Sequence, residues 1–150
     1  MQTVKNQIVD IAEAQLLASK ICKKFKVGDV IFLKGELGTG KTTLSGFIIN
    51  HLHILHNLPK PNTISSPTFP LLLTYDLNFC EIYHYDFYRI KNIKEIEELD
   101  FFENIENSIT LIEWPELLIK LPFKINHYLI NLELYSNNTR IININYFDYN

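Results

Sequence analysis

Three of the five glycines in this chain lie within six consecutive positions, and a lysine and two threonines follow them directly. The segment Gly35–Thr42 reads GELGTGKT and matches the P-loop pattern G-x-x-x-x-G-K-[ST] at every fixed position. Successive backbone N–H groups of such a loop turn inward around a phosphate, which requires backbone angles that glycine adopts readily. We therefore predict that this segment binds the phosphates of a nucleotide, through Gly35, Glu36, Leu37, Gly38, Thr39, Gly40, Lys41, Thr42 and Thr43.

The end of the loop supplies a charge and a hydroxyl. Lys41 is expected to place its ammonium against the β and γ phosphates, and the small hydroxyl of Thr42 is suited to bind Mg²⁺. The competing interpretation is a glycine-rich turn without a ligand. An apolar run precedes the loop and a helical pattern follows it, as phosphate binding at a helix N-terminus requires. The motif therefore predicts nucleotide binding, but it does not define the reaction.

A phosphate loop needs a second group, an acid at the carboxyl end of a neighbouring strand, to hold Mg²⁺ and direct water. Glu113 follows the apolar run 109–112, and Asp86 follows the run 82–85. Each acid is either a Mg²⁺-binding or water-positioning group or an ordinary acid at the end of a strand. The presence of the loop favours the functional interpretation for both.

Three further features are open to two interpretations each. The hydroxyls of Ser65–Phe69 lie beside a proline, and the segment either senses the nucleotide or leads into a strand. The three histidines between positions 51 and 56 either form a metal site or are favoured there by the helix dipole. Arg89 either stabilises phosphate charge or pairs with an acid of the segment 95–98.

Hydrophobic patterns indicate the elements that must position these residues. Val30–Leu33 is a continuous apolar run typical of a buried strand, and a helical pattern from Thr42 to His53 follows the loop. The other predicted elements are a helix over 11–24 with Asp10 as its N-cap, strand hairpins over 69–76 with 81–88 and over 128–135 with 140–146, one or two short helices within 92–106, and a strand over 108–113.

Together these elements predict a P-loop NTPase-like fold. We expect residues 1–150 to form a single α/β domain whose mixed sheet has a parallel centre, with antiparallel hairpin strands added to it and helices flanking it. A chain of 150 residues that is 47% hydrophobic is consistent with one domain and one substantial core.

Composition excludes several classes of function. The net charge of −3 gives no general attraction to DNA or RNA, so any contact with tRNA has to be local or mediated by a partner. No apolar run is long enough to cross a membrane, and the first ten residues do not resemble a secretory signal. The two cysteines are expected to be reduced, buried thiols. These features predict a cytoplasmic protein without a membrane partner.

An ordered set of motifs resembles the TsaE family, also called YjeE, which comprises small bacterial ATPases needed to make threonylcarbamoyladenosine in tRNA. The resemblance extends over nearly the whole chain. Its motifs are GELGTGKTT at Gly35–Thr43, SPTF at Ser66–Phe69, HYDFYR at His84–Arg89, EEL at Glu97–Leu99 and IEWPE at Ile112–Glu116. The P-loop alone is generic, whereas the later motifs in this order are specific.

The resemblance implies ATP or ADP and Mg²⁺ as cofactors, and the TsaD and TsaB proteins as partners. It implies catalytic roles for Lys41, Asp86 and Glu113, with Thr42, Glu113 and Asp86 on the metal side. It also implies switch or partner-sensing roles for Ser66, Thr68 and Trp114. Hydrolysis of ATP would then reset the partner complex, and tRNA would be reached only through that complex.

Some positions depart from the family pattern, because Ala14 and Ala18 stand where the family commonly has threonine and glycine. The contacts to adenine in that region therefore remain undefined by the resemblance. The C-terminal hairpin has no diagnostic residues and is similar in order and length only.

Three other functions are compatible with a P-loop. A small-molecule or nucleoside kinase usually needs an arginine-rich lid, and this chain has only Arg89 and Arg140. A GTPase needs the guanine-reading motif N-K-x-D, which is absent from the sequence. A nucleotide-dependent binding module without turnover differs from the ATPase in one respect, since its function would survive the change Glu113→Ala.

Overall fold

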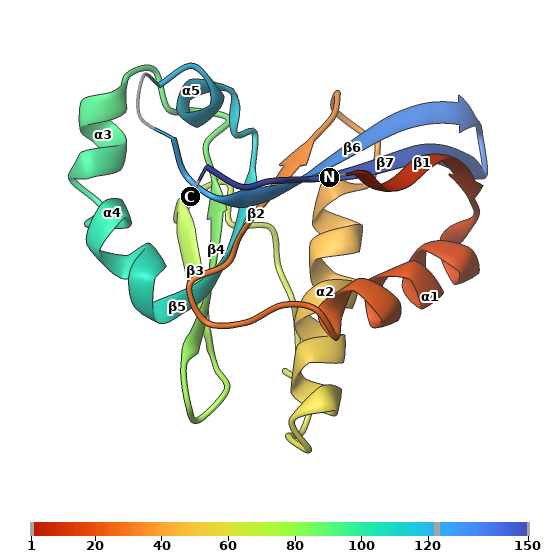
Figure 1. The fold of residues 1–150 in the computed structure, drawn as a ribbon, viewed down its shortest axis with the longest axis horizontal. Helices are drawn as coiled ribbons and strands as arrows, with labels where there is room; N and C mark the ends of the chain where they lie inside the picture. Colours follow the sequence, from red (N-terminus) through yellow and green to blue (C-terminus); the bar gives the residue numbers. More distant parts are fainter. Residues whose placement is uncertain (1, 122–123, 150) are drawn as a thin grey trace.

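The structure, a computed structural model, describes residues 2–121 and 124–149. A seven-stranded sheet with helices on both faces makes up its body (Figure 1). Along the chain the elements are β1 (Gln2–Val9), α1 (Ile11–Cys22), β2 (Val30–Lys34), α2 (Lys41–Leu55), β3 (Leu72–Asp76), β4 (Glu81–Asp86), α3 (Ile93–Glu97), α4 (Phe101–Asn104), the 3-10 helix η1 (Ile105–Asn107), β5 (Ser108–Glu113), α5 (Glu116–Ile119), β6 (His127–Ser136) and β7 (Thr139–Phe147).

The strands follow the order β1-β7-β6-β2-β5-β4-β3. The four central strands, β6, β2, β5 and β4, are mutually parallel. The pairs β6–β7, β1–β7 and β3–β4 are antiparallel. A parallel centre with antiparallel hairpin strands on either side is the predicted fold class, which is therefore confirmed.

Both faces of the central sheet are buried, which explains why its strands are continuous apolar runs. On β2, Ile31 and Leu33 belong to the core cluster that includes α1 and α2. Val30 and Phe32 belong to the opposite cluster, which includes residues of α3, α4 and α5. Alternate residues of one strand thus supply two cores, and Figure 1 shows the two groups of helices on opposite sides of the sheet.

The N-terminal helix begins where its cap residue predicts. The Asp10 carboxylate accepts a hydrogen bond of 2.8 Å from the backbone N–H of Glu13, and the Glu13 side chain accepts one from the N–H of Asp10. This reciprocal pair satisfies two backbone donors that the first helical turn leaves without partners. The predicted cap is confirmed, and the helix ends at Cys22, two residues before the predicted end.

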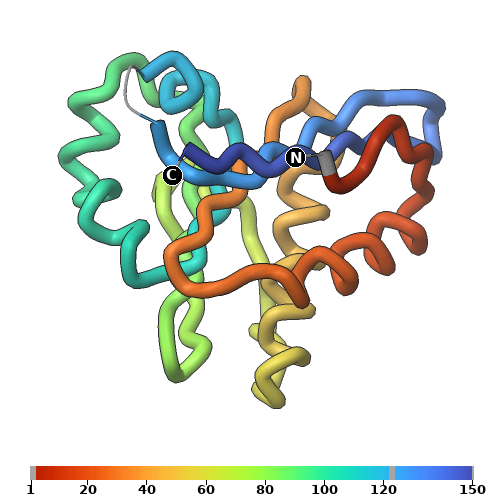
Figure 2. The backbone as a smooth tube through the Cα atoms, viewed as in Figure 1, coloured from red at the N-terminus to blue at the C-terminus, as the bar shows by residue number. Residues whose placement is uncertain are grey.

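Several elements differ from the sequence-based expectations. The short helix α5 was not predicted, and the strand predicted over 69–76 begins only at Leu72. β1 was not predicted, because its polar sequence QTVKNQIV lacks a strand alternation and it pairs with β7 alone, with two register shifts. Figure 2 shows this N-terminal segment running beside the C-terminal strand. The strand predicted over 81–88 ends at Asp86, and the Phe87 N–H completes the last rung of the parallel ladder by donating to the carbonyl of Glu113.

The cysteines are both free. Cys22 is buried as expected, and burial raises the pKa of its thiol to about 12. Cys80 is only half-buried, so the expectation of two fully buried thiols is wrong for that residue. Among the helices of residues 2–121 and 124–149, none has the length and apolar character needed to cross a membrane.

His127 makes the stability of the fold depend on pH. Its ring is buried, with centroids 4.3 Å from Phe32 and 5.0 Å from Phe147, and its Nδ1 lies 2.7 Å from the carbonyl oxygen of Ile125. Burial lowers the pKa of this histidine, and the backbone hydrogen bond opposes the shift only in part. The unfolded chain therefore binds a proton at higher pH than the folded chain does.

We expect the contribution of His127 to be fully present above its unfolded pKa of about 6.5 and to be lost as the pH falls through and below that value. Urea unfolding at several pH values between about 7.5 and 5 measures this loss in the free energy of unfolding. The variant His127→Phe, which keeps the ring stacking, is expected to show a shallower loss over the same range. Equal pH dependence in the two proteins would contradict this account.

Candidate active site

The predicted phosphate loop connects the end of β2 to the start of α2. Gly40 precedes α2 with a φ of 101°, a left-handed conformation that side chains disfavour. Gly35, at the start of the loop, has no space for a side chain, since a Cβ there would lie 2.6 Å from the carbonyl oxygen of Leu132. The sequence places glycines at these positions because the loop cannot form with larger residues.

Lys41 lies buried inside this loop. Its ammonium donates hydrogen bonds to the carbonyl oxygens of Gly35, at 2.6 Å, and Glu36, at 2.9 Å. The same nitrogen lies 4.1 Å from the centroid of the Trp114 ring. Burial lowers the pKa of Lys41, and the negative charges of Glu113 and Asp86 act in the opposite direction. A phosphate bound in the loop would add a further negative charge and favour the protonated form.

The two predicted carboxylates meet at the carboxyl ends of the central strands. Asp86 on β4 is paired in register with Glu113 on β5, and Glu113 is paired with Leu33 on β2. Both carboxylates are buried. The three strands run parallel, so their last residues lie along one edge of the sheet, directly below the loop. The sequence-based placement of both acids beside the loop is therefore confirmed.

Both oxygens of Glu113 have hydrogen-bond partners. Its Oε1 accepts a hydrogen bond of 2.7 Å from the Thr42 hydroxyl, and its Oε2 lies 2.6 Å from Nε2 of His84. A carboxylate only accepts, so Nε2 of His84 carries the proton in this pair. Glu113 is thereby held in one orientation, with one oxygen directed at the first turn of α2.

Asp86 connects the segment around Ser66 to the same site. Its Oδ2 accepts a hydrogen bond of 2.7 Å from the Thr68 hydroxyl, and its Oδ1 accepts one of 2.9 Å from the N–H of Tyr88. The hydroxyls of Ser66 and Thr68 lie 2.7 Å apart. β3 begins only at Leu72, so the segment is not the start of a strand. The segment thus contacts the site through Asp86 and leads to β3 through a turn, and its role in sensing the nucleotide stays a prediction.

Trp114 has an unusual backbone conformation next to Glu113. Its φ of 60° lies in the left-handed region, which is uncommon for a large aromatic residue. Its ring contacts the Lys41 ammonium on one side, and its centroid lies 4.8 Å from that of Tyr88. A strained residue that covers the loop lysine is typical of functional sites.

These groups surround a cavity of about 480 Å³. Most of the predicted site residues line it, namely Leu37, Gly38, Gly40, Lys41, Thr42, Thr43, Ser66, Thr68, Asp86, Glu113 and Trp114. Gly35 and Glu36 are not among the lining residues, and they contribute the two carbonyl oxygens that hold Lys41. Thr39 lines a neighbouring cavity instead.

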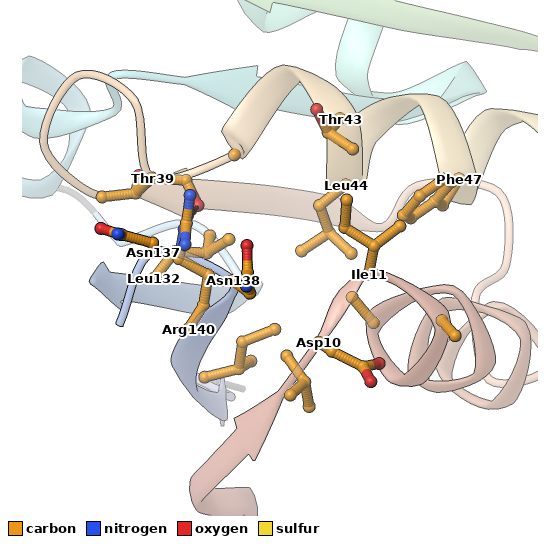
Figure 3. A pocket seen from close by; sticks show the side chains of 15 residues that line it. Asp10, Ile11, Thr39, Thr43, Leu44, Phe47, Leu132, Asn137, Asn138 and Arg140 are labelled. Carbon is orange, nitrogen blue, oxygen red and sulfur yellow. Dashed lines mark hydrogen bonds between the residues drawn. The ribbon is translucent and has the colours of Figure 1, made fainter. Parts of the chain in front are cut away.

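That second cavity, of about 460 Å³, lies beside the loop (Figure 3). Apolar side chains of α2, Leu44 and Phe47, line one side of it, and Asn138 and Arg140 of the C-terminal hairpin line another. Residues 9–12, at the junction of β1 and α1, complete the wall. The two cavities share Gly40, Thr43 and Arg140 as lining residues and therefore adjoin each other at the loop.

Three residues of the site, His84, Tyr88 and Arg140, were given no role from the sequence. His84 lies two positions before Asp86, and alternate residues of a strand share a face, so this spacing was a usable signal. Arg140 donates hydrogen bonds to the carbonyl oxygens of Gly38 and Thr39, more than a hundred residues away along the chain. No local pattern predicts such a contact.

Among the described residues, the metal interpretation of the histidines is not supported, and the pairing of Arg89 with an acid of the segment 95–98 is not observed. Across the described part of the chain, no group of three or more His, Cys, Asp or Glu side chains is arranged to hold a metal ion, and this includes the histidines between positions 51 and 56. Arg89 makes no ion pair in the same residues, and its guanidinium lies 5.3 Å from the centroid of the Phe69 ring.

Comparison with known proteins agrees with this geometry. The family model described as threonylcarbamoyl adenosine biosynthesis protein TsaE matches residues 8–142. A relative from Rickettsia felis, named tRNA threonylcarbamoyladenosine biosynthesis protein TsaE, is 39% identical over 134 residues, which cover 88% of this chain and 74% of that protein. The protein of the same name from Bacillus subtilis is 31% identical over 119 residues, covering 79% and 70%.

The crystal structure of YdiB from Bacillus subtilis superposes with a TM-score of 0.66 at 23% sequence identity, covering 96% of this chain and 86% of that chain. The superposition shows that the two proteins share a fold. The family match, the relatives and the motifs at the site lead to one conclusion. The chain belongs to the TsaE family of tRNA threonylcarbamoyladenosine biosynthesis proteins.

Proposed function

We propose that this chain binds ATP with Mg²⁺, hydrolyses it slowly to ADP and phosphate, and acts as a cytoplasmic accessory subunit on a complex of the TsaD and TsaB proteins. The observation that carries the proposal is the 2.7 Å hydrogen bond between the Thr42 hydroxyl and the Glu113 carboxylate. It joins the P-loop hydroxyl to the strand-end acid, the pair that holds Mg²⁺ in P-loop NTPases.

The donors at the site suit this metal. Mg²⁺ prefers oxygen ligands and is usually held by one or two carboxylates together with substrate phosphates and water. Thr42, Glu113 and Asp86 supply oxygens of this kind beside the loop. Mg²⁺ would supply neutralisation of charge on the phosphates, and Glu113 and Asp86 would orient it and the attacking water.

The remaining residues divide between binding and sensing. The backbone N–H groups of the loop and the Lys41 ammonium would hold the phosphates, and the second cavity would hold the base against Leu44 and Phe47. Thr68 and Trp114 contact groups that a nucleotide would displace, namely Asp86 and Lys41. Both would therefore change position with nucleotide state, which is how a partner could read it.

The partner-dependent role has a direct test. We expect the isolated chain to release phosphate from ATP slowly. The rate should rise when TsaD and TsaB are present, because binding of the partners then drives the conformational change that limits turnover. A phosphate-release assay with each partner alone and with both measures this. Fast turnover that the partners leave unchanged would contradict the accessory role, and transfer of phosphate to an added nucleoside would favour the kinase interpretation.

A further inference from the structure

We propose that Arg140 is a positioning residue, which holds the phosphate loop in its binding conformation through hydrogen bonds to backbone carbonyls of the loop. The inference rests on the proposed nucleotide binding and adds a residue to it. Arg140 is the second residue of the C-terminal hairpin strand β7 and pairs with Leu134 of β6 and Val9 of β1. It is half-buried and reaches from this strand to the apex of the loop (Figure 3).

The guanidinium of Arg140 connects two backbone segments. Its Nε donates a hydrogen bond of 3.0 Å to the carbonyl of Thr39, and one terminal nitrogen donates one of 3.3 Å to the carbonyl of Gly38. The other terminal nitrogen donates to the carbonyls of Ser136, at 3.2 Å, and Thr139, at 3.0 Å. A planar fork of donors is suited to such a bridge, whereas a lysine ammonium is a single point charge.

The charge of Arg140 is not neutralised by an acid. In residues 2–121 and 124–149, the ion pairs within 4.0 Å do not include Arg140, and its hydrogen bonds go to backbone carbonyls only. The positive charge therefore remains available to the loop. Together with Lys41, it makes the loop a more favourable place for an anion.

The particular carbonyls that Arg140 contacts matter for phosphate binding. The carbonyl of Gly38 shares a peptide group with the N–H of Thr39, and that of Thr39 shares one with the N–H of Gly40. A hydrogen bond accepted by the oxygen of a peptide group polarises it and strengthens its N–H as a donor. Arg140 thus contacts two peptide groups of the predicted phosphate cradle. The N–H of Thr39 donates to the carbonyl of Glu36 at 3.3 Å, so the Gly40 N–H is the donor that this contact would strengthen toward a phosphate.

The location of Arg140 between the two cavities supports the same role. It lines both of them, together with Gly40 and Thr43. The glycine at position 40 allows the loop backbone many conformations, so a tertiary contact is needed to select one. Binding is tighter when a loop is already ordered in its bound form, because less conformational entropy is lost on binding.

The experiment compares Arg140→Gln and Arg140→Lys with the control Lys23→Gln, which removes one positive charge from an exposed position at the end of α1. Calorimetric titration with ADP is expected to show a loss of affinity of about tenfold or more for Arg140→Gln. The affinity of Arg140→Lys for ADP should be intermediate, since lysine keeps the charge but lacks the planar fork of donors. Lys23→Gln should bind ADP as tightly as the original protein does.

Two further measurements separate positioning from a general effect on folding. The amide proton resonance of Gly40 in the nucleotide-free protein should shift in Arg140→Gln and Arg140→Lys and stay fixed in Lys23→Gln. In steady-state hydrolysis, KM for ATP should rise by a larger factor than kcat falls, because the loop binds ground and transition states alike. A folding effect alone would lower the melting temperature and the active fraction without raising KM.

Unchanged ADP affinity and an unchanged Gly40 resonance in Arg140→Gln would overturn the inference while leaving the proposed function intact. Failure of the original protein to bind ADP would instead overturn the proposed function itself. If Arg140→Gln does not fold, Arg140→Lys carries the test, because it keeps the aliphatic stem and the charge. Equal affinity and resonance in Arg140→Lys and the original protein would then be the overturning result.

Discussion

Lys41→Ala is expected to lower the affinity for ATP by about a hundredfold or more. The ammonium of Lys41 is fixed in the loop by the carbonyls of Gly35 and Glu36, so its charge is already in place before a phosphate arrives. Alanine removes that charge from a buried position, where water compensates for it poorly. The backbone N–H groups alone are then left to bind the phosphates.

Equilibrium dialysis with labelled ATP measures this loss of binding. The matched control is Lys34→Ala, which removes the same charge from an exposed position at the end of β2, just before the loop. We expect Lys34→Ala to retain binding within about threefold, since an exposed charge is screened by salt and water. Equal losses in the two variants would show that Lys41 acts through net charge only, and no loss in either would contradict the P-loop assignment.

Glu113→Gln is expected to reduce the rate of ATP hydrolysis by about a hundredfold or more while changing ATP affinity much less. Glu113 is the residue that contacts both Thr42 and His84, so it fixes the geometry on the metal side of the site. The amide of glutamine is neutral and has one acceptor oxygen instead of two. Its oxygen can still accept from His84 and its NH₂ can donate to the Thr42 hydroxyl, so the direction of that second hydrogen bond is reversed, and the charge that Mg²⁺ requires is lost.

The measurement is phosphate release at saturating ATP over a series of Mg²⁺ concentrations, alongside a binding titration of the same variant. Glu106→Gln is the control, because this exposed acid precedes the opposite end of β5 and lies outside the site. Partner-dependent activity that survives Glu113→Gln without hydrolysis would favour a nucleotide-dependent binding module. If Glu113→Gln hydrolysed ATP at the same rate as Glu106→Gln, Glu113 would not be a catalytic residue.

The sequence was most informative where function depends on neighbouring residues. The P-loop is one contiguous segment, and its glycines, lysine and threonine are required by local backbone geometry. Asp86 and Glu113 are separated in sequence, yet each follows an apolar run, and parallel strands align such ends at one edge. The proximity of the two carboxylates follows from the fold class, so the fold and the position of these acids could be predicted together.

The sequence was least informative where contacts join distant segments without a local pattern. β1 has a polar sequence because it lies at the edge of the sheet and pairs with β7 only, so hydrophobic alternation did not indicate it. The contact of Arg140 with the loop depends on how the C-terminal hairpin packs. The residues beside the second cavity were also not predicted, since Asn138 and Phe47 come from elements far apart in the chain.

The most direct test of nucleotide binding at this site is calorimetric titration of the full chain with ATP in the presence and absence of Mg²⁺. We expect saturable binding of one ATP per chain, tightened by Mg²⁺. The Mg²⁺ effect should be lost in Glu113→Gln, and the binding itself should be lost in Lys41→Ala. Absence of saturable binding by the original protein, or binding that Lys41→Ala leaves unchanged, would contradict nucleotide binding at this site.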